Sequence, residues 1–251
     1  MTSIPAGNDA LNRARAELAS TGVLRAGINM GNFLLVSGRT ADGGPDGVSP
    51  DMARAIAAGL GVPVALVPFE TPGELGDAVD ANVWDIALIG AEPQRAEKIA
   101  FTSAYAQIEA TYLVPPGSPI AAMAEVDRPG VRISVAGRSA YGLWLDRNIT
   151  RATLVRAANT EAAVSQFTAD RLDVLAGLRP ALIENAHELP GARVLDGHFA
   201  TVQQAVGTAK ANLEAARFLA AFVEEAKASG FVASLIAKHG VEGRLSVAPP
   251  A

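Results

Sequence analysis

Residues 62–89 read VPVALVPFETPGELGDAVDANVWDIALI, two apolar runs on either side of a more polar segment. The apolar runs, Val62–Phe69 and Trp84–Ile89, have the length and composition of buried strands, and the prolines of the first run indicate strand ends or a sheet edge. Thr71–Asn82, between the two runs, is typical of a helix. A strand, a helix and a second strand in this order predict a βαβ unit with parallel strands.

The preceding residues extend this unit on its N-terminal side. Val23–Asn29 predicts another short strand. Gly47–Gly61 predicts a helix with Ser49 as its N-cap, Pro50 at its first position and a glycine at its end. The resulting βαβαβ order implies a parallel sheet that carries its ligand crevice at the carboxyl ends of the strands.

A second series of strands and helices begins after Thr111–Pro119, and two C-terminal helices follow it. The expected strands are Val131–Val135, Leu154–Arg156 and Leu172–Ala176; one helix opens at Gly137, and the others cover Thr160–Thr168, Pro180–His187, Asn212–Ala228 and Gly230–His239. Two similar α/β units in tandem suggest a protein of two lobes.

Composition limits the classes of function. The chain has 251 residues, of which 49% are hydrophobic, enough for one large domain or two small ones. Its formal net charge of -5 and the scatter of its basic residues argue against a nucleic-acid-binding surface. It has no cysteine, and its histidines, His187, His198 and His239, lack the close spacing of zinc motifs. We therefore expect neither a metal site nor a cofactor.

The sequence also bears on location. No segment stays apolar over the roughly 18 residues that a membrane helix needs, so we do not expect the chain to be embedded in a membrane. Residues 1–22 lack the basic and apolar regions of a signal peptide. The expected location is periplasmic if a leader has been removed from the chain, and cytoplasmic if Met1 is the native start. We expect a monomer.

Glycine-containing turns follow the ends of three predicted strands. Asn29–Phe33 follows the first strand, Gly90–Arg95 follows the strand that ends at Ile89, and Gly137–Ser139 opens a helix of the second unit. Glycine lets a backbone approach a ligand closely, and a helix N-terminus offers unpaired N–H groups with a partial positive charge. Either these turns are ordinary connections, or together they hold a small anionic group between two lobes.

Five segments, taken in order, carry a likeness to a known family: Leu24–Asn29, Gly47–Ala53, Trp84–Ala87, Pro93–Tyr105 and Gly137–Ser139. Together they resemble the family 3 solute-binding proteins of ABC transporters, the polar-amino-acid group of type II periplasmic binding proteins. The resemblance covers nearly the whole chain. It implies an α/β fold of two lobes, each a mainly parallel sheet flanked by helices. Two hinge crossings would join the lobes, and a cleft between them would close on a small ligand.

The resemblance implies that Arg95 and Thr102 grip a ligand carboxylate, because the family places an arginine seven residues before a serine or threonine for this purpose. A guanidinium can bind a carboxylate through two parallel hydrogen bonds. The loop from Gly90 to Arg95 is shorter than the family's usual pattern, which changes how far the arginine reaches. The alternative is an exposed arginine at a helix start that binds nothing.

In the second lobe, the resemblance matches Gly137, Arg138 and Ser139 to a turn that presents a hydroxyl and backbone N–H groups to the same carboxylate. Ser139 is also a suitable N-cap, and the two roles are compatible because a capping hydroxyl can touch a ligand. Tyr141 lies on the first turn of the same helix and is a candidate to face the ligand.

The loop after the first strand has two interpretations. Asn29, Asn32 and Phe33 match a family loop that often places an aromatic side chain against the ligand. Asparagines in a folded loop need no ligand, however, since their side chains commonly stabilise turns. Both interpretations stay open from the sequence.

Leu178 departs from the family pattern. Amino-acid binders of this kind usually have an aspartate five residues after the position of Asp173, and the resemblance assigns it to the ligand α-ammonium. Leucine accepts no hydrogen bond, and a buried, unpaired ammonium is costly. Either the ligand has no α-amino group, or Glu92 or Glu109 replaces the aspartate. For Glu109, within the apolar stretch 106–114, we favour the cleft over a hinge hydrogen bond to backbone.

We expect lobe 1 to contain residues 1–110 and 206–251, and lobe 2 to contain residues 111–205. The expected function is to bind a small carboxylate-bearing metabolite, an amino acid or organic acid, as the solute receptor of an ABC importer, with the transporter permease as partner. One alternative is an enzyme similar to cyclohexadienyl dehydratase, although the sequence shows neither a nucleophile elbow nor a phosphate loop. The other alternative is a ligand-sensing module without a transport role.

Overall fold

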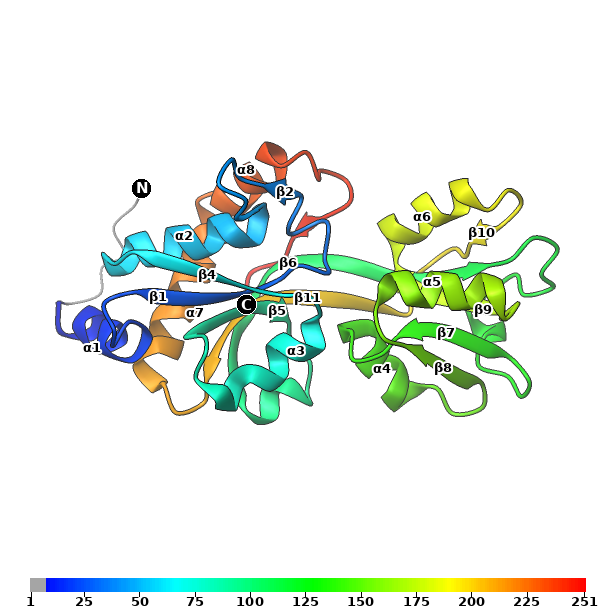
Figure 1. The fold of residues 1–251 in the computed structure, drawn as a ribbon, viewed down its shortest axis with the longest axis horizontal. Helices are drawn as coiled ribbons and strands as arrows, with labels where there is room; N and C mark the ends of the chain where they lie inside the picture. Colours follow the sequence, from blue (N-terminus) through cyan, green and yellow to red (C-terminus); the bar gives the residue numbers. More distant parts are fainter. Residues whose placement is uncertain (1–7) are drawn as a thin grey trace. The chain divides into compact units, whose positions relative to one another are not determined.

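The computed structural model describes residues 8–251, which form two compact units (Figure 1). The first unit extends to Gln107 and resumes from Gln203 to Ala251, and the second is Ile108–Val202. Two long strands, β6 (Ile99–Val114) and β11 (Ala200–Ala209), contribute residues to both units. The α/β class expected from the sequence is confirmed, whereas the lobe boundaries expected after residues 110 and 205 stay predictions.

The first unit is built on three parallel strands that lie side by side. They are β4 (Val64–Phe69), β1 (Leu24–Asn29) and β5 (Ile86–Gly90), with β1 in the middle. Along the β1–β4 pair, Leu24 lies opposite Val64 and Asn29 lies opposite Phe69. β11 joins β5 in the antiparallel sense, and β6 follows β11. The parallel sheet expected from residues 23–89 is therefore confirmed.

Helices cover both faces of this sheet. Figure 1 shows α2 (Val48–Leu60) and α3 (Pro72–Asp77) on opposite sides of β1. A Cβ atom at Gly27 of β1 would meet Leu75 and Trp84 on the α3 side, so the helix approaches the strand closely there. The Trp84 indole N–H donates to the Leu75 carbonyl at 3.1 Å within a buried apolar cluster. Trp84 thus serves packing.

The start of α2 differs from its predicted form, since Ser49 is not the N-cap. The helix begins at Val48, and its N-cap is Gly47 with a φ of 150°. A Cβ atom at Gly47 would lie 2.3 Å from the Leu35 carbonyl oxygen, so only glycine fits there. Ser49 lies buried in the first turn, where its hydroxyl and that of Tyr105 on β6 form a hydrogen bond of 2.8 Å.

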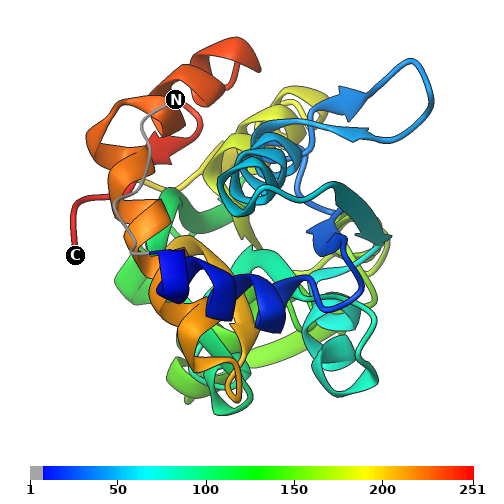
Figure 2. The same ribbon diagram turned by 90° about the vertical axis from the view of Figure 1, so that its left-hand side faces the viewer.

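Two helices from the ends of the chain lie against each other in the first unit. Figure 2 shows α1 (Asn8–Leu18) alongside α7 (Leu213–Ala228). The Glu17 carboxylate accepts a hydrogen bond of 2.7 Å from the Ala215 N–H. The remaining elements of the unit are β2 (Gly38–Arg39), β3 (Pro45–Asp46), η1 (Ala78–Ala81), η2 (Arg95–Glu97), α8 (Phe231–Lys238) and β12 (Ser246–Val247). Within residues 8–251, no helix is both long and apolar enough to cross a bilayer.

The second unit repeats the α/β pattern. Its elements are η3 (Met123–Glu125), β7 (Arg132–Ala136), α4 (Ala140–Asn148), β8 (Thr153–Ala157), α5 (Thr160–Ala169), β9 (Val174–Leu178), α6 (Arg179–Glu188) and β10 (Arg193–Val194). β7 lies between β8 and β9 and runs parallel to both. β9 pairs antiparallel with β6, so that Leu178 lies opposite Ala110. The predicted second series of strands and helices is confirmed.

Helices α4 and α5 cover opposite faces of this second sheet. The Ser134 hydroxyl donates to the Ala163 carbonyl of α5 at 2.7 Å. The next residue, Val135, lies toward Gly142 of α4. Successive side chains of a strand point to opposite faces, which places the two helices on opposite sides. An apolar core that includes Phe167 fills the unit.

Each unit contains an arginine–aspartate ion pair, and the two pairs occupy equivalent places in the topology of their units. In the first, Arg25 of β1 binds Asp85 just before β5, with 2.6 Å between Nη2 and Oδ1. In the second, the backbone N–H of Arg132 on β7 donates to Asp173 just before β9 at 2.8 Å, and its guanidinium also binds that carboxylate. In each unit, the aspartate precedes a strand that runs parallel beside the arginine's strand. The repetition supports the tandem organisation suggested by the sequence.

Candidate ligand-binding site

The loop after β1 folds around its own asparagines. Asn29 Oδ1 accepts a hydrogen bond from the Gly31 N–H at 3.1 Å, and Asn32 Oδ1 accepts one from the Leu34 N–H at 3.2 Å. Both asparagines are buried, whereas Phe33 is 40% exposed. Both asparagines therefore stabilise the turns of this loop. Of the three residues, Phe33 is the one whose apolar side chain is available to a ligand.

Arg95 is buried in η2, shortly after the end of β5. Its Nη1 donates to the Gly90 carbonyl at 2.7 Å, and its side chain lies against Gly76 of α3. Only 8% of the residue is exposed, so the alternative of an exposed arginine at a helix start is wrong. A guanidinium tied to its own loop has a fixed direction, which suits it to recognise a carboxylate.

Thr102 and Glu92 both contribute to the local structure of the first unit. The Thr102 hydroxyl donates to the Ser103 carbonyl at 2.6 Å and accepts from the Val206 N–H of β11 at 3.2 Å. A hydroxyl has one donor and two acceptor positions, so one acceptor position remains. The Glu92 carbonyl accepts from the Ala96 N–H at 2.9 Å, which closes the turn after β5. Thr102 can therefore support a ligand only as an additional acceptor.

Ser139 is the N-cap of α4, as the sequence suggested. Its hydroxyl accepts from the Gly142 N–H at 2.9 Å and donates to the Ala136 carbonyl at 2.8 Å. A Cβ atom at Gly142 would lie 2.7 Å from that carbonyl oxygen, so the glycine lets α4 begin close to the end of β7. The free N–H groups of the first helical turn consequently lie at the carboxyl edge of the sheet, where they can bind an anion.

Arg138, just before Ser139, has an unusual backbone conformation. Its φ is 62°, in the left-handed region that residues with a side chain seldom adopt, and it is exposed. This conformation costs on the order of 1 kcal/mol for a residue other than glycine, and such residues cluster at binding sites. An arginine at a position where glycine would be unstrained supports a role for its guanidinium.

Replacing Arg138 with glycine should raise the free energy of unfolding slightly, by about 0.5 kcal/mol, because relief of backbone strain exceeds the added entropy of the unfolded chain. The same change should weaken carboxylate binding severalfold through loss of a positive charge. Urea unfolding and titration calorimetry would measure the two effects. Arg138→Lys is the control, since it retains both charge and strain. A glycine variant with unchanged affinity would exclude a role for the guanidinium.

Tyr141 lies in the core of the second unit. It is only 5% exposed and belongs to the apolar cluster that fills the unit. Burial raises the pKa of the Tyr141 phenol, although hydrogen bonds with Thr160 and Ser139 oppose the shift. Tyr141 therefore supports Ser139 from the core, and a contact between Tyr141 and a ligand stays a prediction.

Glu109 is held by two side chains of the second unit. Arg179 Nε donates to Glu109 Oε2 at 2.6 Å, and His198 Nδ1 lies 3.3 Å from Oε1. Arg179 also donates through Nη2 to the Gly197 carbonyl. The Glu109 side chain remains 46% exposed. The structure gives Glu109 a side-chain ion pair in addition to the two roles expected from the sequence, and its role toward a ligand stays a prediction.

Leu178 ends β9 and stands at the N-cap of α6, where it makes no side-chain capping bond. Serine, threonine, aspartate and asparagine are preferred at this position because their oxygens accept from the first N–H groups of the helix. Leu178 supplies neither a cap nor an acceptor. Its neighbour across the sheet is Ala110, next to Glu109, so the Glu109–Arg179 pair lies beside this strand end.

The family of the chain follows from its sequence profile. The profile of the bacterial extracellular solute-binding proteins, family 3, matches residues 25–242. The chain belongs to this family. The resemblance drawn from five short segments is thereby confirmed, and the chain is a family 3 solute-binding protein. A search of curated proteins finds no match to its sequence.

Solved structures share the fold of this family 3 protein. A mutant of ArgBP from T. maritima has a TM-score of 0.73 at 19% identity, covering 91% of this chain and 100% of that chain. The ancestral amino acid-binding protein AncCDT-1, a precursor of cyclohexadienyl dehydratase, has a TM-score of 0.71 at 22% identity, covering 88% and 97%. The amino acid ABC transporter substrate-binding protein AbpA from Streptococcus pneumoniae, bound to L-arginine, has a TM-score of 0.72 at 18% identity, covering 88% and 96%. These likenesses confirm the two-lobed α/β fold.

Sequence reasoning on this family 3 protein missed the roles of Arg179 and His198. Arg179 lies three residues after the predicted strand Leu172–Ala176 and directly before Pro180, a local signal that could have identified it. His198 carries no such signal, because its partner Glu109 lies far away in the chain. Gln204, in register with Gly90, is 3% exposed; within residues 8–251, its Oε1 and Gln166 Oε1 are the buried side-chain atoms without a hydrogen-bond partner.

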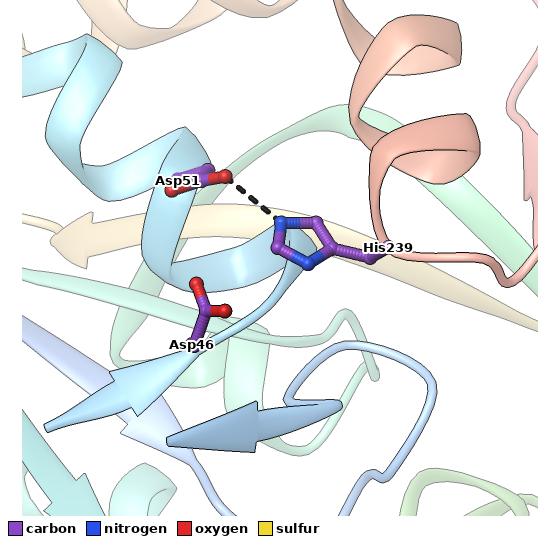
Figure 3. Close-up of side chains that lie close together, drawn as sticks. All are labelled: Asp46, Asp51 and His239. Atoms are coloured by element: carbon purple, nitrogen blue, oxygen red, sulfur yellow. Dashed lines mark hydrogen bonds and ion pairs between the residues drawn. The ribbon is translucent and has the colours of Figure 1, made fainter. Parts of the chain in front are cut away.

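A His–Asp cluster in the first unit has the residue types of a metal site. Figure 3 shows Asp46, Asp51 and His239 close together, and one ligand atom from each lies within 4.8 Å of the others. Asp51, however, already accepts hydrogen bonds of 2.8 Å from His239 Nε2, 2.7 Å from Lys238 and 2.9 Å from Arg54. Burial alone would raise the pKa of Asp51, but these three donors hold it below its usual value. A cation would have to displace them, so the cluster joins α2 to α8 as an ion-pair network.

Proposed function

We propose that this family 3 solute-binding protein binds a small metabolite through a carboxylate group, closes its lobes on it and delivers it to the permease of an ABC importer. The observation that carries the proposal is the burial and fixed direction of Arg95 at the end of β5. The second unit contributes the Ser139 turn and Arg138, which combine N–H groups, a hydroxyl and a positive charge. Such groups are the usual partners of a carboxylate.

Closure follows if the same carboxylate contacts groups of both units. A ligand shifts a conformational equilibrium only by its difference in affinity for the two states. A ligand held by Arg95 alone would stabilise both states equally, whereas one that also contacts the Ser139 turn would favour the closed state. We propose that the protein acts outside the cytoplasmic membrane, where the permease receives its cargo.

A thermal-shift screen followed by titration calorimetry tests the proposal. The panel contains amino acids, because AncCDT-1 and AbpA are described as amino acid-binding proteins. It also contains hydroxy, keto and simple carboxylic acids. At a ligand concentration of 100 times the dissociation constant, the free energy of unfolding should rise by about 2.7 kcal/mol. The matching carboxamides should have no effect, and small-angle scattering should show a smaller radius of gyration with ligand. Equal shifts from acids and amides would contradict the proposal.

Two further measurements separate the alternatives. Fractionation of cells that express the complete native gene should place the protein outside the inner membrane; retention in the cytoplasm would favour a sensing module. Incubation with prephenate should give no phenylpyruvate absorbance. Turnover in that assay would instead support an enzyme similar to cyclohexadienyl dehydratase.

A further inference from the structure

We infer that the ligand has no ammonium group beside its carboxylate, so that the protein selects hydroxy, keto or unsubstituted acids over the corresponding amino acids. The inference rests on the proposed function and concerns the groups that surround the carboxylate in the second unit. It follows from the charges at one edge of that unit's sheet.

The carboxyl edge of the second sheet favours negative charge. Helices α4, α5 and α6 begin directly after β7, β8 and β9, so three helix N-termini lie at this edge. Each N-terminus carries a partial positive charge. Arg138, before α4, adds a positive charge to this edge, and Arg179, at the first position of α6, neutralises the negative charge of Glu109 there. An ammonium placed here would meet charges of its own sign.

The two acids expected to receive an ammonium, Glu109 and Glu92, already have partners within the chain. Glu109 is bound by Arg179 and His198, and its Oε2 to Arg179 Nε distance of 2.6 Å is that of a close ion pair. Glu92, the other acid expected to receive an ammonium, also has an interaction within the chain. A carboxylate already paired with a cation attracts a second cation more weakly than an unpaired one, so Glu109 is a weak partner for an ammonium ligand.

Glu161 is a further acid at this edge, in the first turn of α5. It is exposed, and a carboxylate in the first helical turn is stabilised by the N–H groups of its own helix. The negative charge of Glu161 therefore already interacts favourably with the N-terminus of α5. Glu161 nevertheless provides a direct check on the inference, since its removal would abolish any ammonium binding that depended on it.

Leu178 adds an apolar side chain to this edge. It is the last residue of β9, directly before α6, and packs partly against the apolar core of the unit. A hydroxyl or keto group beside a leucine carries no net charge, so its desolvation costs far less than that of an ammonium. The end of β9 thus combines the apolar side chain of Leu178 with the neutralised Glu109–Arg179 pair. These surroundings favour a ligand whose substituent beside the carboxylate is uncharged.

The test compares each standard amino acid with its 2-hydroxy and unsubstituted analogues by calorimetry on the full chain. Within every set that binds, the hydroxy or unsubstituted acid should bind at least tenfold more tightly than the amino acid. Tighter binding of the amino acid would overturn the inference and leave the proposed function intact, and its loss in Glu161→Gln would identify the missed partner. Absence of binding by every acid would overturn the proposed function and this inference with it.

Two variants test the cause of the selectivity. Leu178→Asp should move the affinity ratio at least tenfold toward the amino acid, and the variant should fold because aspartate is a favoured N-cap. Leu178→Asn, a neutral cap of similar shape, should leave the ratio unchanged. Arg179→Met should move the ratio in the same direction as Leu178→Asp, because it releases Glu109.

Arg193→Met is the matched control for Arg179→Met. Arg193 lies opposite Val114, the last residue of β6, five residues along the strand from Glu109. Its removal should leave the affinity ratio unchanged. An unaltered ratio in both Leu178→Asp and Arg179→Met would show that these residues do not exclude the ammonium.

Discussion

Replacing Arg95 with alanine is expected to weaken carboxylate binding by more than tenfold, a loss of at least about 1.4 kcal/mol. The buried guanidinium is held toward its own loop by the Gly90 carbonyl, so it needs little reorganisation to bind a carboxylate. Its removal would leave the carboxylate without its strongest partner in the first unit. Titration calorimetry against the best acid from the screen measures the loss.

The same substitution also removes the bond to Gly90, so stability has to be measured separately. We expect a decrease of about 1 kcal/mol in the free energy of unfolding of the ligand-free protein. Arg95→Lys, which keeps the charge but loses the planar fork, should bind with intermediate affinity. Arg217→Ala is the matched control, because Arg217 is 73% exposed and pairs with Glu214 on α7. Unchanged affinity in a folded Arg95→Ala variant would remove Arg95 from the site.

Replacing Asp127 with alanine is expected to lower the free energy of unfolding by about 2 kcal/mol at neutral pH, since several charge-assisted hydrogen bonds to backbone are lost. The Asp127 carboxylate accepts from the N–H groups of Thr150, Arg151 and Ala152, with distances of 2.7 Å to Arg151 and 2.8 Å to Ala152. It thereby ties the segment before β7 to the start of β8. Urea unfolding measures the loss, and faster hydrogen exchange of these amides would localise it.

The contribution of Asp127 should depend on pH in the acid range. Hydrogen bonds from backbone N–H groups, first that of Ala152, lower the pKa of Asp127 from 3.8 to about 2. A group whose pKa falls on folding stabilises the protein above its unfolded value and loses that effect as pH decreases through its folded value. The difference between the wild type and Asp127→Ala should therefore shrink between about pH 4 and pH 2. Asp146→Asn, at the exposed Arg156 pair, is the control; a difference that stays constant with pH would contradict the assignment.

Much of the fold could be predicted because its signals are local. Val62–Phe69 and Trp84–Ile89 are apolar runs bounded by breakers, and they correspond to β4 and β5. Thr71 caps α3 through the Glu74 N–H, a pattern that depends on residues three apart. The start of α2 was misplaced because the deciding contact, between Gly47 and the Leu35 carbonyl, involves a loop twelve residues away.

The candidate site was only partly predictable. Arg95 and Ser139 stand next to glycine turns at strand ends, where short sequence motifs are informative. The burial of Tyr141 and the pairing of Glu109 depend on how helices and strands pack. The residues next to them in the sequence do not determine that packing. The sequence showed Glu109 in an apolar stretch and suggested a cleft residue, but it did not show that Arg179, at the start of α6, is the ion-pair partner of Glu109.

The sequence by itself determined the α/β class, the order of strands and helices, the family and the positions of the strand-end turns, because each depends on periodicity and on residues close together in the chain. Only the tertiary structure decided which charges are already satisfied. Glu109 meets Arg179 through the register of β6 with β9, and Asp51 meets His239 where α2 packs on α8. The physical reason is that an ion pair forms wherever packing brings two charges within a few ångströms, whatever their separation along the chain.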